Sequence, residues 1–303
     1  MRSAAVAIAI MVLAAAPAAA QGNGNGHAFG RYKPKPASST TTTTTTTTAA
    51  PATVDAPPIF GVRQFGSWLD DASLVEPAHG YASISMGHYR SLAGRQTDFP
   101  IVDGAFGLTP HLQVGVSVPY HRLTFNDGTQ VTGLGDVYLS TKVSLISPED
   151  TVSQFGLAIS PVLEVLGDPD PIKNSRLFWG LPVNVELRRE GYRIYGSGGY
   201  FSRGALFGSG ALEVPLHERV IATAVLAYTR SLNANPGADS LGLSKGRMDV
   251  SGAAAYVLSP SFVVFGSVGR TISAKDINAS SLVVSGGLSV SFVGRSSVRG
   301  RTH

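Results

Sequence analysis

The chain carries a repeated pattern of alternating hydrophobicity that constrains its fold more than any other feature. Between Gly80 and Val293, apolar side chains recur at every second position over stretches of about ten residues, with turn residues between the stretches. A period of two is the period of a β-strand that has one apolar face. The pattern predicts an all-β protein of twelve antiparallel strands. They span residues 81–89, 99–108, 112–122, 135–146, 153–166, 176–188, 192–201, 205–215, 219–230, 247–258, 262–272 and 281–293.

The connections between the predicted strands alternate in length. Short turns follow the even strands, at residues 109–111, 147–150, 189–191, 216–218 and 259–261. Longer polar connections follow most odd strands, at residues 125–135, 168–174, 233–246 and 274–280, and the exception is the short connection near residues 202–204. Short turns at one rim and long loops at the other are typical of outer-membrane barrels. An even strand count places both ends of such a barrel at the short-turn rim.

Within the strands, charged side chains fall on the face opposite to the apolar one. Leu112, Val114 and Val116 share one face of their strand, whereas Gln113 and Ser117 share the other. Strand 262–272 is ambiguous, because Val and Phe occupy both faces and only Arg270 indicates that its even positions face inward. The inward charges of the other strands are predicted to line a lumen. These candidates are Asp103, Asp136, Lys142, Glu164, Arg176, Glu186, Arg193, Glu213 and Asp249.

A soluble β-sandwich shows the same alternation with its apolar face buried in a core, so other features must decide between core and lipid. Charged residues make up 15% of the chain, where about 25% is usual for soluble proteins. The polar face is rich in small residues rather than Lys and Glu. Aromatic residues recur near strand ends, as in the interface girdle of a membrane barrel. The girdle candidates are Tyr89, Tyr120, Trp179, Tyr192, Tyr200, Tyr228 and Tyr256. These features favour a transmembrane barrel of the outer membrane.

The residues on either side of the barrel form distinct segments. Residues 1–20 combine one positive charge, a short apolar stretch and three Ala before Gln21, which predicts a secretory signal peptide rather than the alternative, a membrane anchor. Residues 21–57 are rich in Gly, Pro and Thr, and they predict a disordered periplasmic tether, with a glycosylated stalk as the alternative. Residues 58–79 are expected to form a periplasmic segment in front of the barrel, and whether they plug the lumen is open. Residues 294–303 are a C-terminal tail.

Composition and motifs argue against several other chemistries. The net charge is only +4 and the basic residues are scattered, so nucleic acid is not expected as a partner. The chain has no Cys, which removes disulfides and thiolate metal sites. Residues 133–136 lack the Gly and Lys of a phosphate loop. The acidic pair in residues 168–170 lacks the remaining ligands of a calcium loop, and no metal or cofactor is predicted.

Two histidines raise the question of catalysis. His88 and His121 lie near the outer ends of two predicted strands, where a lipid hydrolase of the barrel rim would place its base. A nucleophile needs such a base within hydrogen-bond reach, and the sequence shows no local arrangement of Ser, His and acid. The chain is therefore not expected to be an enzyme, and a rim lipid hydrolase ranks third among the functional hypotheses.

Two neighbouring stretches resemble a known family. Residues 107–120, GLTPHLQVGVSVPY, and residues 133–147, GLGDVYLSTKVSLIS, resemble the hairpin of the outer-membrane transporter-like proteins labelled phenol-degradation meta-pathway proteins. The resemblance is densest over residues 99–147 and extends more loosely over residues 80–293. It implies an outer-membrane barrel with a role in moving hydrophobic or aromatic compounds.

Three functions are compatible with these observations. The first is a channel or facilitator for passive uptake of small compounds, the second a structural or tethering barrel with a filled lumen, and the third the rim hydrolase. The expected partners are outer-membrane lipid, a small permeant and, through the tether, periplasmic or cell-wall components. Small inward side chains leave room in the lumen and favour the channel. They include Gly115, Ser117, Ser140, Ser197, Ser209 and Ser251.

Overall fold

The computed structural model describes residues 68–92, 94–148, 151, 153–167, 175–232, 244–273, 276 and 279–293. It also describes the backbone of a short antiparallel pair, β1 (Gln21–Gly22) and β2 (Gln64–Phe65). The predicted signal peptide, the remainder of the predicted tether and the C-terminal tail lie outside the described residues. No helix in the described part of the chain is long and apolar enough to cross a membrane.

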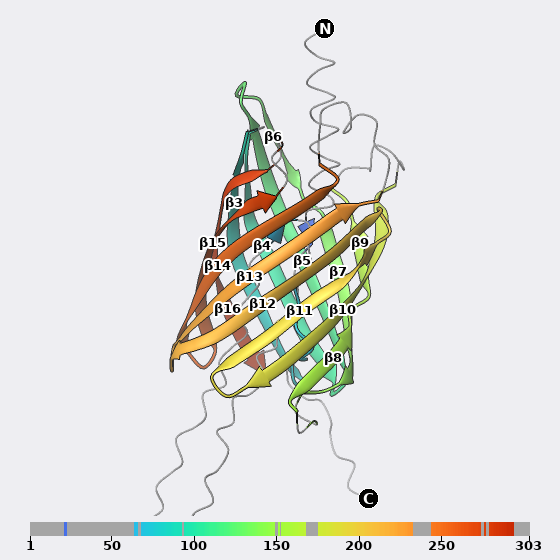
Figure 1. The fold of residues 1–303 in the computed structure, drawn as a ribbon, viewed down its shortest axis with the longest axis vertical. Coiled ribbons are helices and arrows are strands. Elements are labelled where there is room, and N and C mark those ends of the chain that lie inside the picture. Colours follow the sequence, from blue (N-terminus) through green and yellow to red (C-terminus); the bar gives the residue numbers. More distant parts are fainter. Residues whose placement is uncertain are drawn as a thin grey trace, which may run out of the picture.

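The described residues form a closed antiparallel barrel of twelve strands, as predicted (Figure 1). Each strand pairs with the next along the chain, and the last strand, β16, closes the barrel by pairing with the first, β3. The elements are β3 (His79–Ser91), β4 (Gly94–Thr109), β5 (Leu112–Phe125), β6 (Gln130–Leu134), β7 (Val137–Ile146), β8 (Phe155–Ile159), β9 (Val162–Val165), β10 (Leu177–Arg189), β11 (Tyr192–Phe201), β12 (Ala205–His217), β13 (Val220–Ser231), β14 (Gly246–Ser259), β15 (Phe262–Ser273) and β16 (Ser280–Val293).

Two strands of the wall are interrupted, which reconciles the fourteen elements of the sheet with twelve strands. β6 and β7 pair with the same strand, β5, on either side of a break at Gly135 and Asp136. β8 and β9 likewise pair with both neighbours around a break at Ser160 and Pro161. Proline lacks the N–H that a continuous ladder requires at that position.

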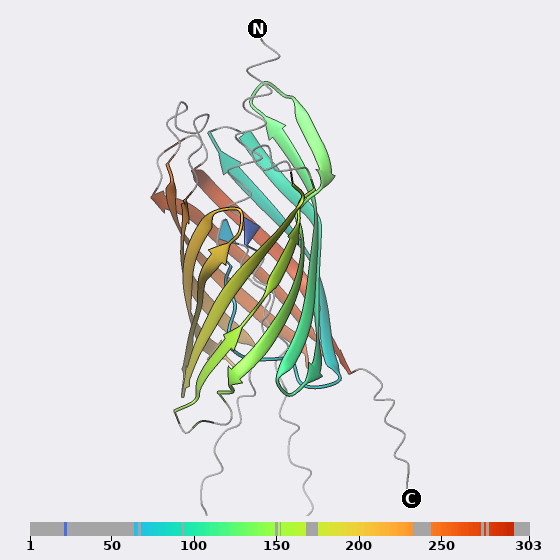
Figure 2. The same cartoon turned by 90° about the vertical axis from the view of Figure 1, so that its right-hand side faces the viewer.

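The predicted long connection at residues 125–135 is wrong in its extent. β5 continues to Phe125, and β6 starts at Gln130 and pairs back onto β5. The connection is therefore a hairpin whose turn lies at residues 126–129, and it extends the barrel wall on the long-loop side (Figure 2). Its polar residues concealed the strand pairing, because an extension beyond the apolar band of the wall lacks the apolar face that gives the alternating signal.

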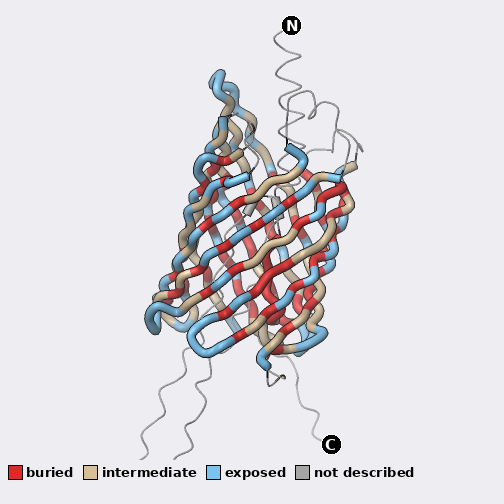
Figure 3. Tube along the Cα trace, viewed as in Figure 1, coloured by how far each residue is buried: buried red, intermediate tan, exposed pale blue. Residues whose placement is uncertain are grey.

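Buried and exposed residues alternate along the strands (Figure 3), and the exposed positions carry the large apolar side chains, as the parity of the sequence predicted. Large apolar side chains are exposed all around the wall, which is the arrangement that lipid requires and that water penalises. The most central of them on β10 keep 41–45% of their surface exposed. The exposed set includes Ile84, Val116, Leu139, Leu181, Val183, Val185, Ile194, Leu212, Leu226 and Val264.

Five of the seven predicted girdle residues are exposed on the outer surface. They are Tyr120, Trp179, Tyr192, Tyr228 and Tyr256.

The other two girdle candidates differ from these five. Tyr200 is partly exposed and packs against the ring of Trp179, with 5.9 Å between the ring centroids. Tyr89 does not belong to the girdle, because it is only 7% exposed and lies on the inward face of β3 together with Ser83 and Ser85. Its position near a strand end led to the wrong assignment, whereas the parity of the strand decides its direction.

The ambiguous strand, β15, faces the opposite way from the direction that Arg270 indicated. Val263 and Phe265 are buried, and Val264 and Val268 are exposed, so the odd positions face inward. Arg270 is exposed near the end of the strand that leads to the long-loop rim. An arginine at that depth can extend its long side chain to the polar interface, so its charge does not require an inward position.

Candidate functional site in the lumen

Six consecutive residues that precede the first strand lie inside the barrel. Residues 68–73, here called the lumen segment, are all buried. Figure 2 shows this part of the chain inside the barrel, enclosed by the strands of the wall. At the short-turn rim, the N–H of Ala78 donates to the carbonyl of Gly107 at 2.9 Å, and Pro77 bridges to the same glycine. The predicted periplasmic segment 58–79 is thus, over residues 68–73, an occupant of the lumen.

Trp68 anchors the upper end of the lumen segment. Its ring centroid lies 6.3 Å from that of Tyr138 on β7 and 6.3 Å from that of Phe201, the last residue of β11. Phe207 continues this cluster at 5.4 Å from Phe201. Phe201 is next to the turn at residues 202–204 on the long-loop side, so the chain from Trp68 to Ala78 runs through the barrel from that side to the short-turn rim. Below Trp68, Leu69 packs in a second buried cluster with Tyr195.

The backbone of the lumen segment is hydrogen-bonded to wall side chains. Ser197 Oγ accepts from the N–H of Asp70 at 2.7 Å and lies 2.9 Å from the carbonyl of the same residue. Ser209 donates to the carbonyl of Trp68 at 2.5 Å. The side-chain oxygen of Gln113 accepts from the N–H of Val75 at 2.8 Å. The small inward residues predicted to leave room in the lumen, Ser197 and Ser209, are therefore the groups that hold this segment.

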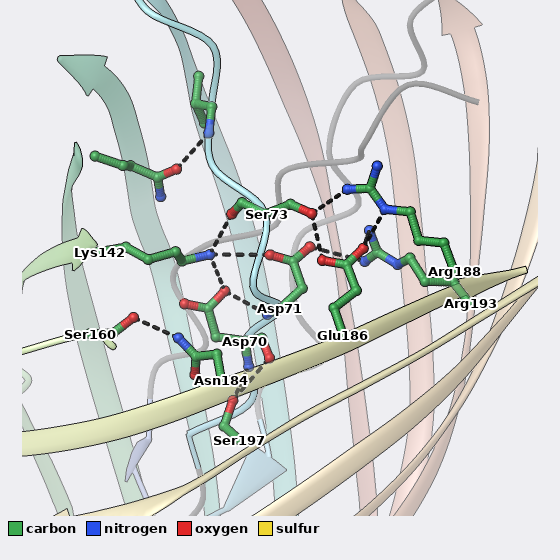
Figure 4. Close-up of polar contacts among 12 residues, drawn as sticks. Asp70, Asp71, Ser73, Lys142, Ser160, Asn184, Glu186, Arg188, Arg193 and Ser197 are labelled. Atoms are coloured by element: carbon green, nitrogen blue, oxygen red, sulfur yellow. Dashed lines mark hydrogen bonds and ion pairs between the residues drawn. The ribbon is translucent and has the colours of Figure 1, made fainter. Parts of the chain in front are cut away.

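Lys142 on β7 is the principal charged contact of the lumen segment (Figure 4). Its Nζ lies 2.6 Å from Asp70 Oδ1 and 3.1 Å from Asp71 Oδ1, and it donates to the carbonyl of Ser73 at 3.0 Å. Lys142, Asp70 and Asp71 are at most 3% exposed. A buried ammonium requires such compensation, because removing an ion from water costs several kcal/mol.

A second charged group continues from Asp71 along β10 and β11. Arg193 Nη2 lies 3.1 Å from Asp71 Oδ2, and its guanidinium is also 3.5 Å from both Glu186 and Glu213. Ser73 donates to Glu186 Oε2 at 2.5 Å, and Arg188 contacts both Ser73 and Glu186. Figure 4 shows these side chains converging on the lumen segment from adjacent strands. Alternation along β10 explains the arrangement, because Glu186 and Arg188 are two residues apart and share the inward face.

A third charged group lies near Trp68. Arg203, in the short turn between β11 and β12, points into the lumen and is 7% exposed. Its guanidinium lies 3.2 Å from Glu164 Oε1 and 3.5 Å from Asp136 Oδ2, and Tyr138 donates to Glu164 at 3.0 Å. These contacts connect the two interrupted strands of the wall to the turn between β11 and β12, across the intervening strand β10.

The nine predicted lumen-lining residues divide into three groups. Asp103, Lys142, Glu164, Glu186, Arg193, Glu213 and Asp249 are buried on the inward face, and Asp136 is partly buried at the break between β6 and β7.

Arg176 is the exception among these nine, because it is exposed immediately before β10. Its position in the alternation matches the inward-facing residues of β10, but it lies before the first residue of that strand. It therefore does not join the buried charged groups of the lumen. Asp103 and Asp249 are held by neighbours on the wall: Ser117 donates to Asp103, and Arg247 pairs with Asp249 at 2.9 Å.

The predictions missed Asp70, Asp71, Arg188 and Arg203 as members of one lumen site. The sequence did offer a signal for the first two, since an acidic pair beside Trp68 and Leu69 is unusual in a segment expected to be solvated. Arg188 shares the parity of Glu186 but was not selected. Arg203 lies in a turn, where the alternation along a strand does not predict the direction of a side chain. The only unusual feature of this turn in the sequence was its short length.

The two histidines considered for catalysis lie on opposite faces of the wall. His88 follows the outward parity of Ile84 and Met86, and its Nδ1 is 2.9 Å from Thr97 Oγ1. His121 follows the inward parity of Gln113 and Ser117 and is paired with Asp98 in the register of β4 and β5. The two histidines therefore do not meet in one site, and the hypothesis of a rim lipid hydrolase gains no support from their positions. Within the described residues, no group of His, Cys, Asp and Glu could hold a metal ion.

Comparisons with known proteins relate the fold, and not the sequence, to outer-membrane channels. No family model matches the chain, and no curated protein matches its sequence. The COG4313 outer-membrane channel from Pseudomonas putida F1 superposes with a TM-score of 0.54 at 10% identity, over 73% of this chain and 98% of that one. The NanC porin superposes with a TM-score of 0.50 at 9% identity, over 69% of this chain and 98% of that one. The chain thus has the fold of an outer-membrane channel.

Proposed function

We propose that this protein is an outer-membrane channel for passive uptake of small compounds, and that the lumen segment closes it. One observation carries the proposal: residues 68–73 fill the lumen without belonging to its wall. The backbone contacts of Trp68 and Asp70 go to the side chains of Ser209 and Ser197. The lumen segment can therefore leave while the hydrogen bonds between wall strands stay intact.

The composition of the lumen supports this assignment. A barrel whose only task is structural is stabilised best by an apolar interior, because buried ion pairs seldom add net stability. Here the inward face instead carries charged groups on β7, β9, β10, β11 and β12. Charged groups in a lumen are compatible with water and solutes once the occupant leaves.

The location and the orientation complete the proposal. The signal peptide predicted from residues 1–20 would export the chain, and the exposed apolar outer face would insert it into the outer membrane. We place the short-turn rim in the periplasm, since short turns are found on that side in such barrels. Trp68, where the lumen segment begins, lies toward the opposite, long-loop side of the barrel, so a contact of the tether predicted from residues 21–57 with cell-wall components would require the chain before Trp68 to turn back toward the periplasm. The resemblance of residues 107–120 to the phenol-degradation meta-pathway proteins supports a hydrophobic or aromatic permeant.

A structural barrel with a filled lumen is the second candidate. The observation in its favour is the complete burial of Trp68, Asp70, Asp71 and Ala72, each with 0% of its surface exposed. Such close packing is also what a firmly closed channel needs, so only a measurement of permeation separates the two candidates.

Liposome swelling with the full-length chain tests the proposal. Asp70→Asn/Asp71→Asn removes the charges that hold the lumen segment to Lys142 and Arg193, and we expect faster swelling in small neutral solutes than for the wild type. Glu190→Gln/Glu218→Gln is the matched control, because it removes two exposed carboxylates from turns and leaves the lumen unchanged. Equal, negligible swelling for all three folded proteins would favour the structural barrel.

A further inference from the structure

We propose that Lys142 and Arg193 form a binding site for small carboxylate-bearing solutes, and that Asp70 and Asp71 occupy this site while the channel is closed. The inference rests on the proposed function, because a solute reaches the site only when the lumen segment has moved. It adds a carboxylate group to the hydrophobic or aromatic permeant proposed above, which the fold alone does not specify.

The contacts of Asp70 and Asp71 are those of a bound dicarboxylate. Oδ1 of each residue lies within 3.1 Å of Lys142 Nζ, and Oδ2 of Asp71 lies 3.1 Å from Arg193 Nη2. Two carboxylates thus engage one ammonium and one guanidinium. The two contacts of Lys142 combine charge with hydrogen bonds and are of the strongest polar kind in proteins, and the contact of Arg193 adds an ion pair.

The charge of the wall around the site favours an anion. With the lumen segment removed, the wall contributes Lys142, Arg188 and Arg193 against Glu186 and Glu213. Among the wall groups that contact the lumen segment or its ion-pair partners, these three cations and two carboxylates leave one positive charge in excess. The two carboxylates of the lumen segment overcompensate this charge, and a small anion entering in their place would be drawn to it.

The site is also positioned along the route through the barrel. Lys142 lies on β7, and Arg193 lies on β11 with its guanidinium 4.4 Å from the ring centroid of Tyr195. Leu69 of the lumen segment packs in the same cluster as Tyr195. When residues 68–73 leave, an apolar surface and a cationic centre are exposed side by side. This combination suits a small organic acid better than an inorganic ion.

Calorimetric titration with malonate tests the site directly, and malonamide serves as its uncharged counterpart. The full-length protein is used in detergent as wild type, as Asp70→Asn/Asp71→Asn, and as the triple variant that also carries Lys142→Gln. We expect malonate to bind the double variant at least roughly tenfold more tightly than it binds the wild type or the triple variant. A tenfold change corresponds to the usual strength of one charge-assisted hydrogen bond. Malonamide should show no such difference between the three proteins. Arg270→Gln in the double variant is the control for a loss of positive charge outside the lumen.

The outcomes separate the inference from the proposed function. Binding of malonate to the double variant that depends on Lys142 supports the site. The site is overturned if malonate binds the double and triple variants equally or binds neither. Both barrels must be folded in this comparison, as judged by their shift on a denaturing gel before and after boiling. Permeation is measured on the same proteins: if malonate binds but liposomes do not swell, the site stands and the channel fails. If liposomes swell but malonate does not bind, the channel stands and the site fails.

Discussion

Asp70 and Lys142 are 72 residues apart in the sequence, yet Asp70 Oδ1 and Lys142 Nζ meet inside the barrel at 2.6 Å. One residue belongs to a segment that is not part of the sheet, and the other belongs to the wall. The ion pair between them, together with packing, holds the lumen segment in its position. The stability of the barrel and the occupancy of its lumen can therefore be changed separately.

Replacing Lys142 should loosen the lumen segment without unfolding the wall. Lys142→Gln removes the cation that both Asp70 and Asp71 contact, and breaking a buried pair costs about 3–5 kcal/mol. We expect hydrogen exchange at the amides of residues 69–73 to accelerate by roughly two to three orders of magnitude, as measured by mass spectrometry. Lys245→Gln, at an exposed position, should leave the exchange unchanged. Unaltered protection in Lys142→Gln would show that packing alone holds the segment.

The two tryptophans of the chain provide a matched pair for testing the anchor. Trp68 has 0% of its surface exposed, whereas Trp179 has 54% exposed on the outer face. Because the sequence contains no Cys, Ser73→Cys introduces a single thiol as a reporter. Trp68→Ala removes a buried aromatic side chain, and such a truncation lowers stability by about 3–5 kcal/mol. We expect faster alkylation of this thiol because the lumen segment is held less firmly. Trp179→Ala should not change the rate, and a similar acceleration in both variants would indicate general loosening of the barrel.

Fluorescence quenching should distinguish the environments of the same two residues. In vesicles of brominated lipid, the protein with Trp68→Phe retains only Trp179, whose ring lies on the surface assigned to lipid, and its emission should be strongly quenched. The protein with Trp179→Phe retains only Trp68 and should be quenched little. Strong quenching of Trp68 would mean that it faces lipid and would contradict its place in the lumen.

Gly107 should be required where the chain enters the barrel. A Cβ at this position would lie 2.2 Å from the carbonyl oxygen of Glu76 and 2.3 Å from that of Val75, and backbone atoms cannot move aside easily. We expect Gly107→Ala to displace the residues that join the lumen segment to β3 and to increase their proteolysis. Gly208→Ala, where a Cβ would meet nothing within 4 Å, is the control. Equal resistance to proteolysis in both variants would argue against a close passage at Gly107.

Much of the barrel was predictable because its signal is repeated and local. The alternation along residues 176–188 and 281–293 identified the strands and their lipid face, and the turn lengths identified the rims. Alternation failed where its physical cause is absent. The hairpin extension at residues 125–135 lies beyond the apolar band, and β15 carries apolar side chains on both faces because Val263 and Phe265 fill the interior.

The lumen site was predictable only in part. Parity placed Lys142, Glu186 and Arg193 on the inward face, but it could not say what they meet, since their partners Asp70 and Asp71 precede the first strand. The small inward side chains favoured a lumen with room for solutes, whereas in the structure residues 68–73 occupy it. Whether the lumen is open or plugged depends on contacts between residues that are far apart in the chain, and no local pattern contains that information.

Single-channel recording in planar bilayers tests most directly whether residues 68–73 close the lumen. The wild type should remain closed for most of the recording, with rare and brief current steps. Asp70→Asn/Asp71→Asn should show sustained openings, because the ion pairs of the lumen segment with Lys142 and Arg193 are lost. Identical open times in the two proteins, or no current in either while both are folded, would contradict a channel closed by this segment.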